Sequence, residues 1–472
     1  MTGEIPVLIR LFNLGAMKPL KYRRRNNKEK QLMDLIRGDV RKLFFRYLTT
    51  ALGSAMIMSI YSVVDMAMVG QYQGPEGTAA LAVFAPCWNI IYSLGLLTGL
   101  GGGVLFAASR GGGRERRAEE YFTIAMAWAA IFSLASQFAI CFFDEELLTF
   151  FGADDKLLPV ALSYMLPIKF AVPFFVFSQT LAAFLRDDAS PVLASAAAAI
   201  GGVYNMIADY LFVFTFDMGV MGAGLATATG AMITVLIMLS HFISKNNTLH
   251  FVVPRMFFFK TRKMLVTGFS TFFADISMGI LTVLFNRQIM RYFGTDALAV
   301  YGVIVNIGTF VQCCGYGIGQ ATQPLLSANF GAKKPQRILA FLRYSLITSA
   351  CFGLFWAISA LAVPNLFVRI FMAPTASVLA IAPFIIRSYG TSFLLLPLNI
   401  FAAYYFQSIM LPAHSFAVTF ARGLALSGSL IIILPFIAGP RALWFAMPLT
   451  ELIVFAAASY FIRRSQKNLL LS

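Results

Sequence analysis

The sequence predicts an all-α integral membrane protein with about twelve transmembrane helices in two similar halves. Of its 472 residues, 59% are hydrophobic and only 12% are charged, and the mean hydropathy of +0.75 lies outside the range of soluble domains. Apolar runs long enough to span a bilayer recur along the whole chain. An internal repeat relates the second half to the first.

The twelve apolar runs fall into two sets of six. The first six are expected near residues 43–70, 78–108, 119–142, 158–184, 190–216 and 219–244. The second six are expected near residues 264–292, 295–328, 338–362, 377–406, 413–435 and 441–464. Each run is apolar enough, over enough residues, to cross the hydrocarbon core of a bilayer as a helix.

The repeat is visible in two pairs of segments. Residues 294–307 (GTDALAVYGVIVNI) echo residues 77–90 (GTAALAVFAPCWNI). Residues 327–337 (SANFGAKKPQR) align with residues 107–117 (AASRGGGRERR). Many secondary transporters are built from two similar halves that both start on the same side of the membrane, so the repeat favours a transporter.

Basic residues gather in alternate loops and near both ends of the chain. They cluster at 21–30, 110–117, 245–263, 333–337 and 463–467. The intervening loop at 144–155 is acidic instead. This distribution follows the positive-inside rule, so we expect a multi-pass protein of the inner (plasma) membrane with both termini cytoplasmic. The net charge of +16 then serves topology and anionic headgroups, and we expect membrane lipids, not nucleic acid, as partners.

The chain is expected to divide into five parts. These are a basic cytoplasmic tail at 1–42, an N-lobe of six helices at 43–244, a cytoplasmic inter-lobe loop at 245–263, a C-lobe of six helices at 264–464 and a cytoplasmic tail at 465–472. The inter-lobe loop mixes basic residues, proline and aromatics, which suits a segment that lies along the membrane interface.

Charged side chains inside the spans are costly in hydrocarbon, so functional residues should be sought among them. The deep ones are Asp65, Lys169, Asp209, Asp275, Arg287, Arg387, Arg422 and Glu451. In the first half, Tyr61 precedes Asp65 and Asn205 precedes Asp209 by four residues each, so each pair shares one helix face. Thr227 and Gln179 add polar groups from two further spans.

If these four spans converge, their side chains form an oxygen-rich site. Two carboxylates that face each other in a low dielectric cannot both stay charged alone, so they share a proton, bind a cation or pair with a base. A cation-coupled transporter needs such a reversible choice. The alternative is structural, because an acid inside a membrane can also bond a neighbouring helix or face a water-filled cavity.

Three strings give this pattern a family resemblance. YSVVDMAMVG (Tyr61–Gly70) resembles the first helix of multidrug and toxic compound extrusion (MATE) transporters, and residues 205–227 (NMIADYLFVFTFDMGVMGAGLAT) resemble their fifth and sixth helices. Residues 317–337 (GIGQATQPLLSANFGAKKPQR) resemble the end of the eighth helix and its loop, especially in prokaryotic members. The family fold has two six-helix bundles related by a pseudo-two-fold axis along the membrane normal. Members export organic cations and other amphipathic compounds in exchange for protons or sodium ions.

By position, the resemblance implies a cation-coupling site in the N-lobe. It would comprise Asp65, Asn205, Asp209 and Thr227, with Tyr61 and Gln179 as supporting hydrogen-bond partners. The two acids would exchange the proton or sodium ion, and the amide and hydroxyl oxygens would be neutral ligands for a transported Na⁺. No other metal and no cofactor is expected, and the coupling ion is H⁺ or Na⁺.

Two features depart from the family pattern. Members often carry a proline early in the first helix, where it is associated with bending, whereas residues 48–55 here read LTTALGSA with Gly53 as the only weak point. Lys169, between Pro167 and Pro173, is also unusual. It could neutralise a nearby acid or extend toward the outer surface, and we favour the second.

The second half lacks a counterpart of the fifth-span pair. Aligning Pro412 with Pro191 puts Leu426 and Leu430 where Asn205 and Asp209 stand. Some family members have a second cation site in the C-lobe, and Asp275 is a candidate for part of one. A structural charge pair is at least as well supported; its possible members are Asp275, Arg287, Arg387 and Arg422. Glu451 could pair with one of these arginines or face the cavity.

We therefore expect a cation-coupled antiporter that exports organic cations or other amphipathic drugs and metabolites by alternating access, acting as a monomer. The alternative is a flippase for a lipid-linked precursor, which shares the superfamily architecture and would use a cavity rich in cationic residues. An enzyme is not expected, with no catalytic residues, because His241, His250 and His414 lie at span ends or in loops with no catalytic or metal-binding arrangement.

Overall fold

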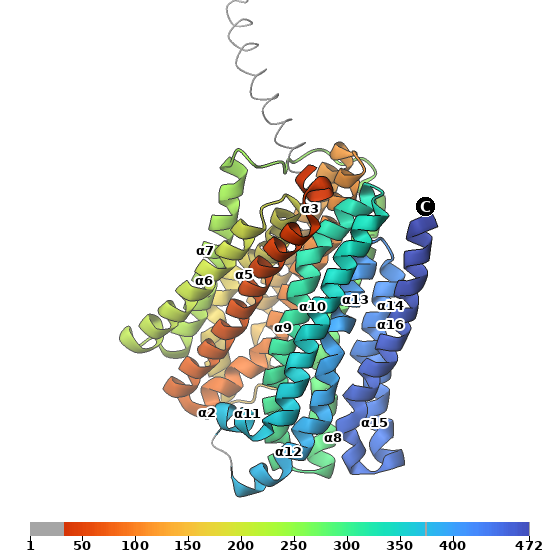
Figure 1. Ribbon diagram of the computed structural model, residues 1–472. Coiled ribbons are helices and arrows are strands. Elements are labelled where there is room, and N and C mark those ends of the chain that lie inside the picture. The colour runs from red at the N-terminus through yellow and green to blue at the C-terminus, as the bar shows by residue number, and fades with distance from the viewer. Residues whose placement is uncertain (1–32, 373–374, 472) are drawn as a thin grey trace, which may run out of the picture.

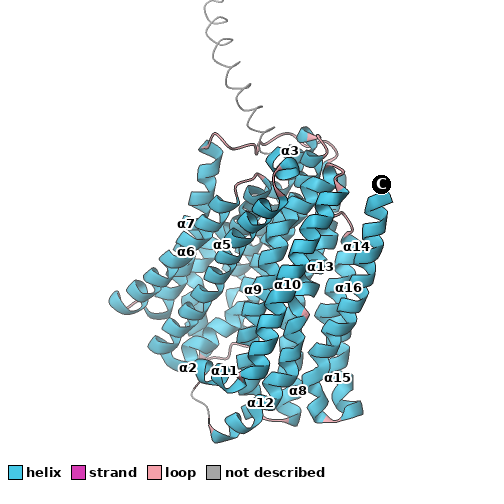
Figure 2. Cartoon of the chain, viewed as in Figure 1, coloured by secondary structure: helices cyan, strands magenta, loops and turns pink. Residues whose placement is uncertain are grey.

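The computed structural model describes residues 33–372 and 375–471, and in this part of the chain it contains helices and no strand (Figures 1 and 2). The helices of the first half are α2 (Val40–Gly111), α3 (Glu115–Phe142), α4 (Asp144–Phe150), α5 (Leu157–Asp187), α6 (Pro191–Tyr210) with η1 (Leu211–Thr215), and α7 (Gly219–Leu239) with η2 (Ser240–Ile243). Those of the second half are α8 (Phe257–Tyr292), α9 (Thr295–Gly331), α10 (Pro335–Ala362), α11 (Pro364–Phe371), α12 (Ala376–Gly390) with η3 (Thr391–Leu394), α13 (Leu396–Ser408), α14 (Pro412–Phe420) with η4 (Ala421–Ala425), α15 (Leu426–Ala438), η5 (Pro440–Phe445) and α16 (Ala446–Leu471).

Twelve segments of the described residues are long and apolar enough to cross a membrane, which confirms the predicted count. Two of them, Val40–Gly74 and Glu76–Gly111, lie within α2, and α12 with α13 forms a single span, Ala376–Ser408. The helices run side by side, with α6 and α7 at one flank and α15 and α16 at the other (Figure 1). We call the end that carries the C-terminus and the loop at 244–256 the basic end.

The first two spans are joined by a sharp turn at Gly74. Its backbone has φ +67° and ψ −150°, a conformation that glycine adopts without the strain a side chain would cause. All other residues of α2 keep helical dihedral angles, Gly53 included. The first span is therefore not broken at the weak point that Gly53 offers.

Two segment boundaries differ from those expected. Helix α8 begins at Phe257, well before residue 264, so the loop between the halves is shorter than predicted. The basic residues near its start are tolerated because Lys260 is buried and forms an ion pair with Glu120 of α3. Helix α16 continues to Leu471, so most of the predicted tail at 465–472 is helical. Most of the predicted basic tail, residues 1–32, lies outside the described residues.

The two halves meet closely at the basic end, through a pair of contacts that the repeat relates. A Cβ atom added to Gly111 at the end of α2 would lie 2.0 Å from the carbonyl oxygen of Ala328 in α9. A Cβ atom added to Gly331 at the end of α9 would lie 1.9 Å from the carbonyl oxygen of Ala108 in α2. Only glycine permits this approach, so the two aligned segments of the repeat cross backbone to backbone.

Large apolar clusters bury the spans against one another. One cluster joins Leu96 and Leu100 of α2 to second-half residues that include Phe285 and Trp444, and another joins Phe44 of α2 to the second half. A third lies within the first half and includes Tyr164 and Phe84, whose rings are 5.6 Å apart. Tyr164 links this third cluster to the polar site described next.

Candidate functional site

Asp65 of α2 is 7% exposed and faces α5. The hydroxyl of Tyr164 donates a hydrogen bond of 3.0 Å to Asp65 Oδ2. The other carboxylate oxygen, Oδ1, is buried and has no hydrogen-bond partner. Tyr164 was not foreseen from the sequence, where it is one aromatic residue among many in an apolar run.

The predicted pair on α6 lies beside Thr227 of α7. The amide of Asn205 donates long hydrogen bonds to Asp209 Oδ1 (3.4 Å) and to Thr227 Oγ1 (3.3 Å). Asp209 is fully buried, and it lies close enough to Asp65 for the two carboxylates to interact electrostatically. The structure thus brings together the four residues that the resemblance implied, from α2, α6 and α7.

Three oxygens of this cluster are buried without a hydrogen-bond partner: Asp65 Oδ1, Asn205 Oδ1 and Asp209 Oδ2. Buried polar atoms are nearly always paired, and a lone orphan usually needs an explanation. Here three acceptors lie in one cluster, and the described residues place no basic side chain in an ion pair with either acid. Such a cluster is suited to hold a proton or a cation.

Glycines bring the backbones of these helices close enough for the cluster to form. A Cβ atom at Gly224 of α7 would lie 2.1 Å from the carbonyl oxygen of Tyr164, so this glycine sets α7 directly against α5. A Cβ atom at Gly230 would lie 3.3 Å from the Cβ of Asn205, which brings α7 close to α6. The small residues before and after Thr227 therefore place its hydroxyl at the centre of the cluster.

A π-helical turn follows the cluster directly. Residues 211–215 form η1, in which the backbone N–H of Phe216 donates to the carbonyl of Leu211 at 2.8 Å. The wider turn starts immediately after Asp209 and Tyr210. Single π turns within α-helices are frequent at functional sites, because the extra residue re-aims the side chains beside it.

The two supporting residues are placed differently from each other. Tyr61 lies against Gly202 of α6, and it is close enough to both Asp65 and Asp209 to interact with them electrostatically. Gln179 instead donates to its neighbour Ser178 Oγ at 3.4 Å, and its Cβ faces Gly95 of α2. Among the described residues, Gln179 makes no hydrogen bond to either acid of the cluster.

Lys169 contacts an acid at the opposite end of the bundle from the basic loops. Its ammonium group forms an ion pair with Asp144 at the start of α4. Burial opposes ionisation of Asp144, but the hydrogen bond and charge of Lys169 hold the pKa of this carboxyl below its usual value. Lys169 therefore both extends toward the loop and neutralises an acid there, and it does not reach the Asp65–Asp209 cluster.

The second half has a buried acid whose oxygens are all satisfied. Glu451 of α16 is fully buried, and Arg422 Nε donates to its Oε1 at 2.8 Å. The amide of Asn399 donates to Glu451 Oε2 at 2.7 Å and to the Glu451 carbonyl at 2.8 Å. This resolves the choice left open for Glu451: it pairs with an arginine.

Asp275 forms no ion pair with any of the three arginines proposed for it, within the described residues. Arg422 is engaged by Glu451, and Arg287 and Arg387 are exposed, the latter donating to the Leu361 carbonyl at 2.9 Å. Asp275 Oδ2 is buried without a hydrogen-bond partner. Tyrosine side chains, including that of Tyr92 in α2, lie close enough to Asp275 to interact with it electrostatically. The suggested charge pair is thus formed by Arg422 with Glu451, without Asp275.

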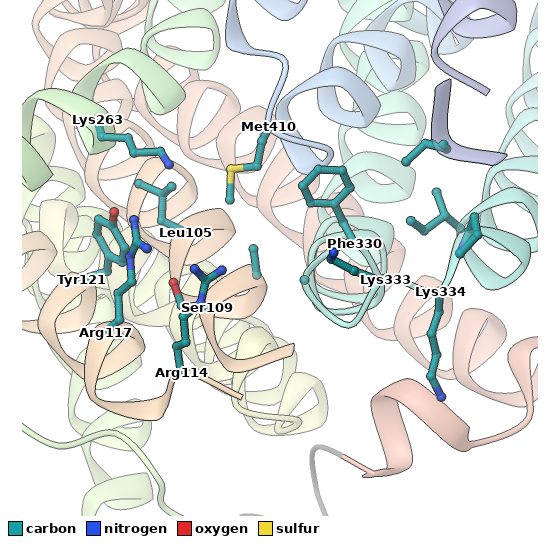
Figure 3. Close-up of a pocket in the computed structure, with 15 residues that line it drawn as sticks. Leu105, Ser109, Arg114, Arg117, Tyr121, Lys263, Phe330, Lys333, Lys334 and Met410 are labelled. Carbon is teal, nitrogen blue, oxygen red and sulfur yellow. The ribbon is translucent and has the colours of Figure 1, made fainter. Parts of the chain in front are cut away.

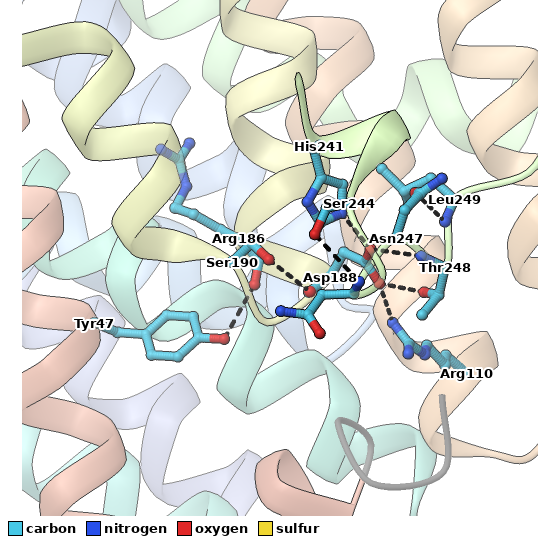
Figure 4. A network of polar contacts seen from close by, with 11 residues as sticks. Tyr47, Arg110, Arg186, Asp188, Ser190, His241, Ser244, Asn247, Thr248 and Leu249 are labelled. Atoms are coloured by element: carbon cyan, nitrogen blue, oxygen red, sulfur yellow. Dashed lines mark hydrogen bonds and ion pairs between the residues drawn. The ribbon is translucent and has the colours of Figure 1, made fainter. Parts of the chain in front are cut away.

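A second polar network, which the sequence did not reveal, lies at the basic end after α5 (Figure 4). Asp188 is fully buried and accepts hydrogen bonds from Arg110 (2.7 Å), the His241 ring (2.7 Å) and the backbone and side chain of Thr248. Burial opposes ionisation of Asp188, but the bond to His241 and the charge of Arg110 hold its pKa below the usual value. Because Asp188 lies in a loop by its sequence position, it does not stand out among the membrane-embedded charges.

Comparisons with known proteins place the chain in context. A sequence model of the MatE family matches residues 51–211 and 270–431. The multidrug export protein MepA of Staphylococcus saprophyticus is 23% identical over 315 residues, covering 65% of this chain and 68% of that protein. MepA of Staphylococcus aureus is 21% identical over 312 residues, with the same coverage of each chain.

Solved structures show the same fold. A multidrug resistance MATE family transporter of the MOP superfamily, in an outward-facing conformation, matches with a TM-score of 0.86 at 19% identity, covering 93% of this chain and 98% of that one. A MATE protein in a straight conformation matches with a TM-score of 0.85 at 20% identity, covering 93% and 99%. These matches confirm the predicted fold class.

Proposed function

The chain belongs to the MatE family of MATE transporters, and from this premise we propose that it exports drugs or related small organic compounds in exchange for protons or sodium ions. The observation that carries the coupling part is the set of three unpaired, buried oxygens on Asp65, Asn205 and Asp209. The names of the MepA relatives support the export part.

The membrane topology follows from charge. The loops at the basic end, such as 110–117 and 333–337, carry the positive residues that remain in the cytoplasm, and the loop with Asp144 faces outward. Both termini are then cytoplasmic in a plasma-membrane protein. We expect the protein to work as a monomer, because each chain contains both halves of a transporter.

The cluster supports antiport because it can bind the coupling ion in the outward-facing state and release it in the inward-facing state. When the site faces outside, a proton or Na⁺ binds between Asp65 and Asp209 and favours release of the exported compound. When it faces the cytoplasm, the ion leaves and the acids regain their negative charge. An organic cation is attracted to this uncompensated charge, so cationic or amphipathic substrates suit the site.

A lipid-precursor flippase is a weaker candidate. The three span arginines that would support it do not form a cationic cavity within the spans, because Arg422 is neutralised by Glu451 and both Arg287 and Arg387 are exposed. The acids of the first half also point to a positive ligand. We therefore prefer the exporter, and we assign no enzymatic activity.

The proposal is tested by ethidium efflux from cells that express the wild type, Asp65→Asn or Asp209→Asn at equal surface levels. Asp155→Asn is the matched control, because it makes the same chemical change at an exposed loop residue. Each strain is assayed with sodium present, with sodium replaced, and with a protonophore. We expect both cluster variants to lose efflux driven by an ion gradient and the control to keep it.

The ion conditions identify the coupling ion, and the two cluster variants test whether coupling depends on Asp65 and Asp209. Loss of efflux on sodium replacement indicates Na⁺ as the coupling ion, whereas efflux that persists without sodium and is lost with the protonophore indicates H⁺. Wild-type efflux from both cluster variants would show that coupling lies elsewhere, with Asp275 the next candidate. Absence of ethidium efflux from the wild type as well would contradict the multidrug substrate class.

A further inference from the structure

A cavity of about 480 Å³ opens at the basic end between the two halves (Figure 3). One wall comes from the turn between α2 and α3 and from α3 itself, with Arg114, Arg117 and Tyr121. The other wall includes Phe330 and Lys333 of the turn between α9 and α10. These are the two turns that the internal repeat relates, and no residue of the Asp65–Asp209 cluster is among the described residues that line the cavity.

Positive charge is concentrated in this cavity without a compensating acid. Its lining includes Arg114, Arg117, Lys263, Lys333 and Lys334, and no Asp or Glu is among the described lining residues. Arg114 and Arg117 both lie close enough to Lys263 for the three charges to repel. The neighbouring acid of α3, Glu120, is already engaged by Lys260 and Arg116.

Not all of the cations face the cavity equally. Lys334 Nζ donates to the carbonyl of Ile36 at 2.9 Å, and Figure 3 shows its side chain directed away from the others. Arg114, Arg117 and Lys263 instead gather near Ser109 and Tyr121 (Figure 3). Arg114, Arg117 and Lys263 therefore form a three-cation wall on one side of the site, and Lys333 lies on the other wall.

Tyr121 gives a second, independent sign that a ligand belongs here. The residue is fully buried, yet its hydroxyl has no hydrogen-bond partner. The Arg117 guanidinium lies over its ring at 5.9 Å, and the hydroxyl points toward Arg117 and Lys263 (Figure 3). The cations beside it offer this hydroxyl no acceptor for its proton, and a phosphate oxygen bound between them would supply one.

We propose that this cavity binds a phosphate group, carried either by an anionic phospholipid headgroup or by a soluble phosphate ester. Two guanidinium groups offer paired N–H donors that match phosphate oxygens, the Lys263 ammonium adds a point charge, and the Tyr121 hydroxyl adds a neutral donor. The remaining wall is apolar, with Leu105, Met410 and Leu469, which suits the organic part of an ester.

The position of the site gives the bound phosphate a structural effect. It would contact cations from α3 and from α8, and so it would offset the repulsion between Lys263 and the two arginines across the two halves, which the Gly111–Ala328 and Gly331–Ala108 contacts hold together. A ligand that binds only when the halves are together favours that arrangement. Binding is thus expected to stabilise the protein with its basic end closed.

Binding can be measured on the purified, full-length protein without any transport assay. In neutral detergent, the melting temperature is followed with inorganic phosphate and with chloride at equal ionic strength, which removes general screening. In parallel, native mass spectrometry counts lipids retained from nanodiscs of phosphatidylcholine mixed with phosphatidylglycerol. The variants are Arg117→Gln and Tyr121→Phe, and Arg464→Gln is the control, an exposed cation outside the cavity lining.

We expect the wild type and Arg464→Gln to prefer a phosphate ligand, with affinity reduced about tenfold or more in Arg117→Gln and about tenfold in Tyr121→Phe. Selective retention of phosphatidylglycerol identifies the lipid as the source, and a melting increase with inorganic phosphate over chloride identifies a soluble anion; either supports the site. Absence of both responses in the wild type, or equal losses in Arg117→Gln and Arg464→Gln, would overturn the proposal. Tyr121→Phe keeps the ring and its packing, so its result does not depend on a misfolded variant.

Discussion

Two buried acidic sites, one in each half of the chain, differ in how their carboxylates are paired. In the first half, Asp65 and Asp209 lie close together with three unpaired oxygens in their cluster and no basic partner among the described residues. In the second half, Glu451 receives hydrogen bonds from Arg422 and Asn399 to both of its carboxylate oxygens.

This contrast separates acids that support structure from acids that can exchange an ion. A carboxylate paired with an arginine is neutralised within the protein and has no reason to bind and release a cation. A pair of carboxylates without such a partner must take a proton or cation from outside to be stable in a low dielectric. The same reasoning distinguishes Asp188, which has Arg110 and His241, from Asp209.

The largest expected effect on stability comes from Glu451→Ala, which leaves the largely buried Arg422 beside the vacated space. Breaking a buried pair on one side costs about 3–5 kcal/mol of unfolding free energy, because the remaining charge loses its partner. Asp209→Asn should lose none, since it removes a charge that has no partner. Unfolding of both purified variants by denaturant in mixed micelles gives the comparison directly.

Replacing both partners, as in Arg422→Met with Glu451→Leu, should recover much of the loss. A Glu451→Ala protein as stable as the wild type would show that the Arg422–Glu451 pair does not stabilise the fold. It would then contradict the contrast with the Asp65–Asp209 cluster.

The next effect is pH-dependent and concerns Asp188. Because the pKa of this residue is lowered in the folded protein, its stabilisation is present above the ordinary Asp pKa of about 3.9 and is lost as the pH falls through the folded value. We expect Asp188→Asn to cost about 1.5–3 kcal/mol at pH 7. Melting curves of the wild type and the variant should converge at strongly acidic pH, and a constant gap would contradict the assignment.

A smaller effect is expected for Tyr164→Phe, which removes the hydroxyl that donates to Asp65 Oδ2. The variant keeps the ring in its apolar cluster but leaves the carboxylate less well oriented. We expect coupling-ion affinity to weaken by about 1.4 kcal/mol, or tenfold, with the melting temperature unchanged. Ion-dependence of efflux measures this, with Tyr210→Phe on an exposed side chain as the control.

The smallest effect is expected for Lys169→Met. Its ion pair with Asp144 is partly exposed at the loop end of the bundle, and such pairs contribute about 1 kcal/mol or less. Neither melting temperature nor efflux should change measurably. A strong loss of coupling would mean that Lys169 acts on the acid cluster after all.

Much of the fold was predictable because the bilayer imposes simple rules. Hydropathy and length locate the twelve spans, and the repeated segments divide them into two halves. The start of α8 was missed for a physical reason. Lys260 looks unsuited to a buried helix until its partner Glu120, far away in sequence, is seen beside it.

The candidate site was predictable where spacing and resemblance agreed, and not where a contact joins distant residues. Asn205 and Asp209 share a helix face by their spacing, whereas the approach of Tyr164 to Asp65 depends on how α5 packs against α2. Arg422 could have paired with Asp275 or Glu451 by sequence alone, because both are embedded acids of the second half. Asp188 escaped notice since it lies just beyond the end of a span.

The paired glycine contacts at the basic end have a consequence for how that end separates. Gly111 on Ala328 and Gly331 on Ala108 are two copies of one contact, related by the repeat, so a relative rotation of the halves that loosens one loosens the other. Packed interfaces of this kind have discrete arrangements and do not stretch gradually. We therefore expect any opening of the basic end to break both contacts together, without a stable intermediate in which one is broken and the other kept.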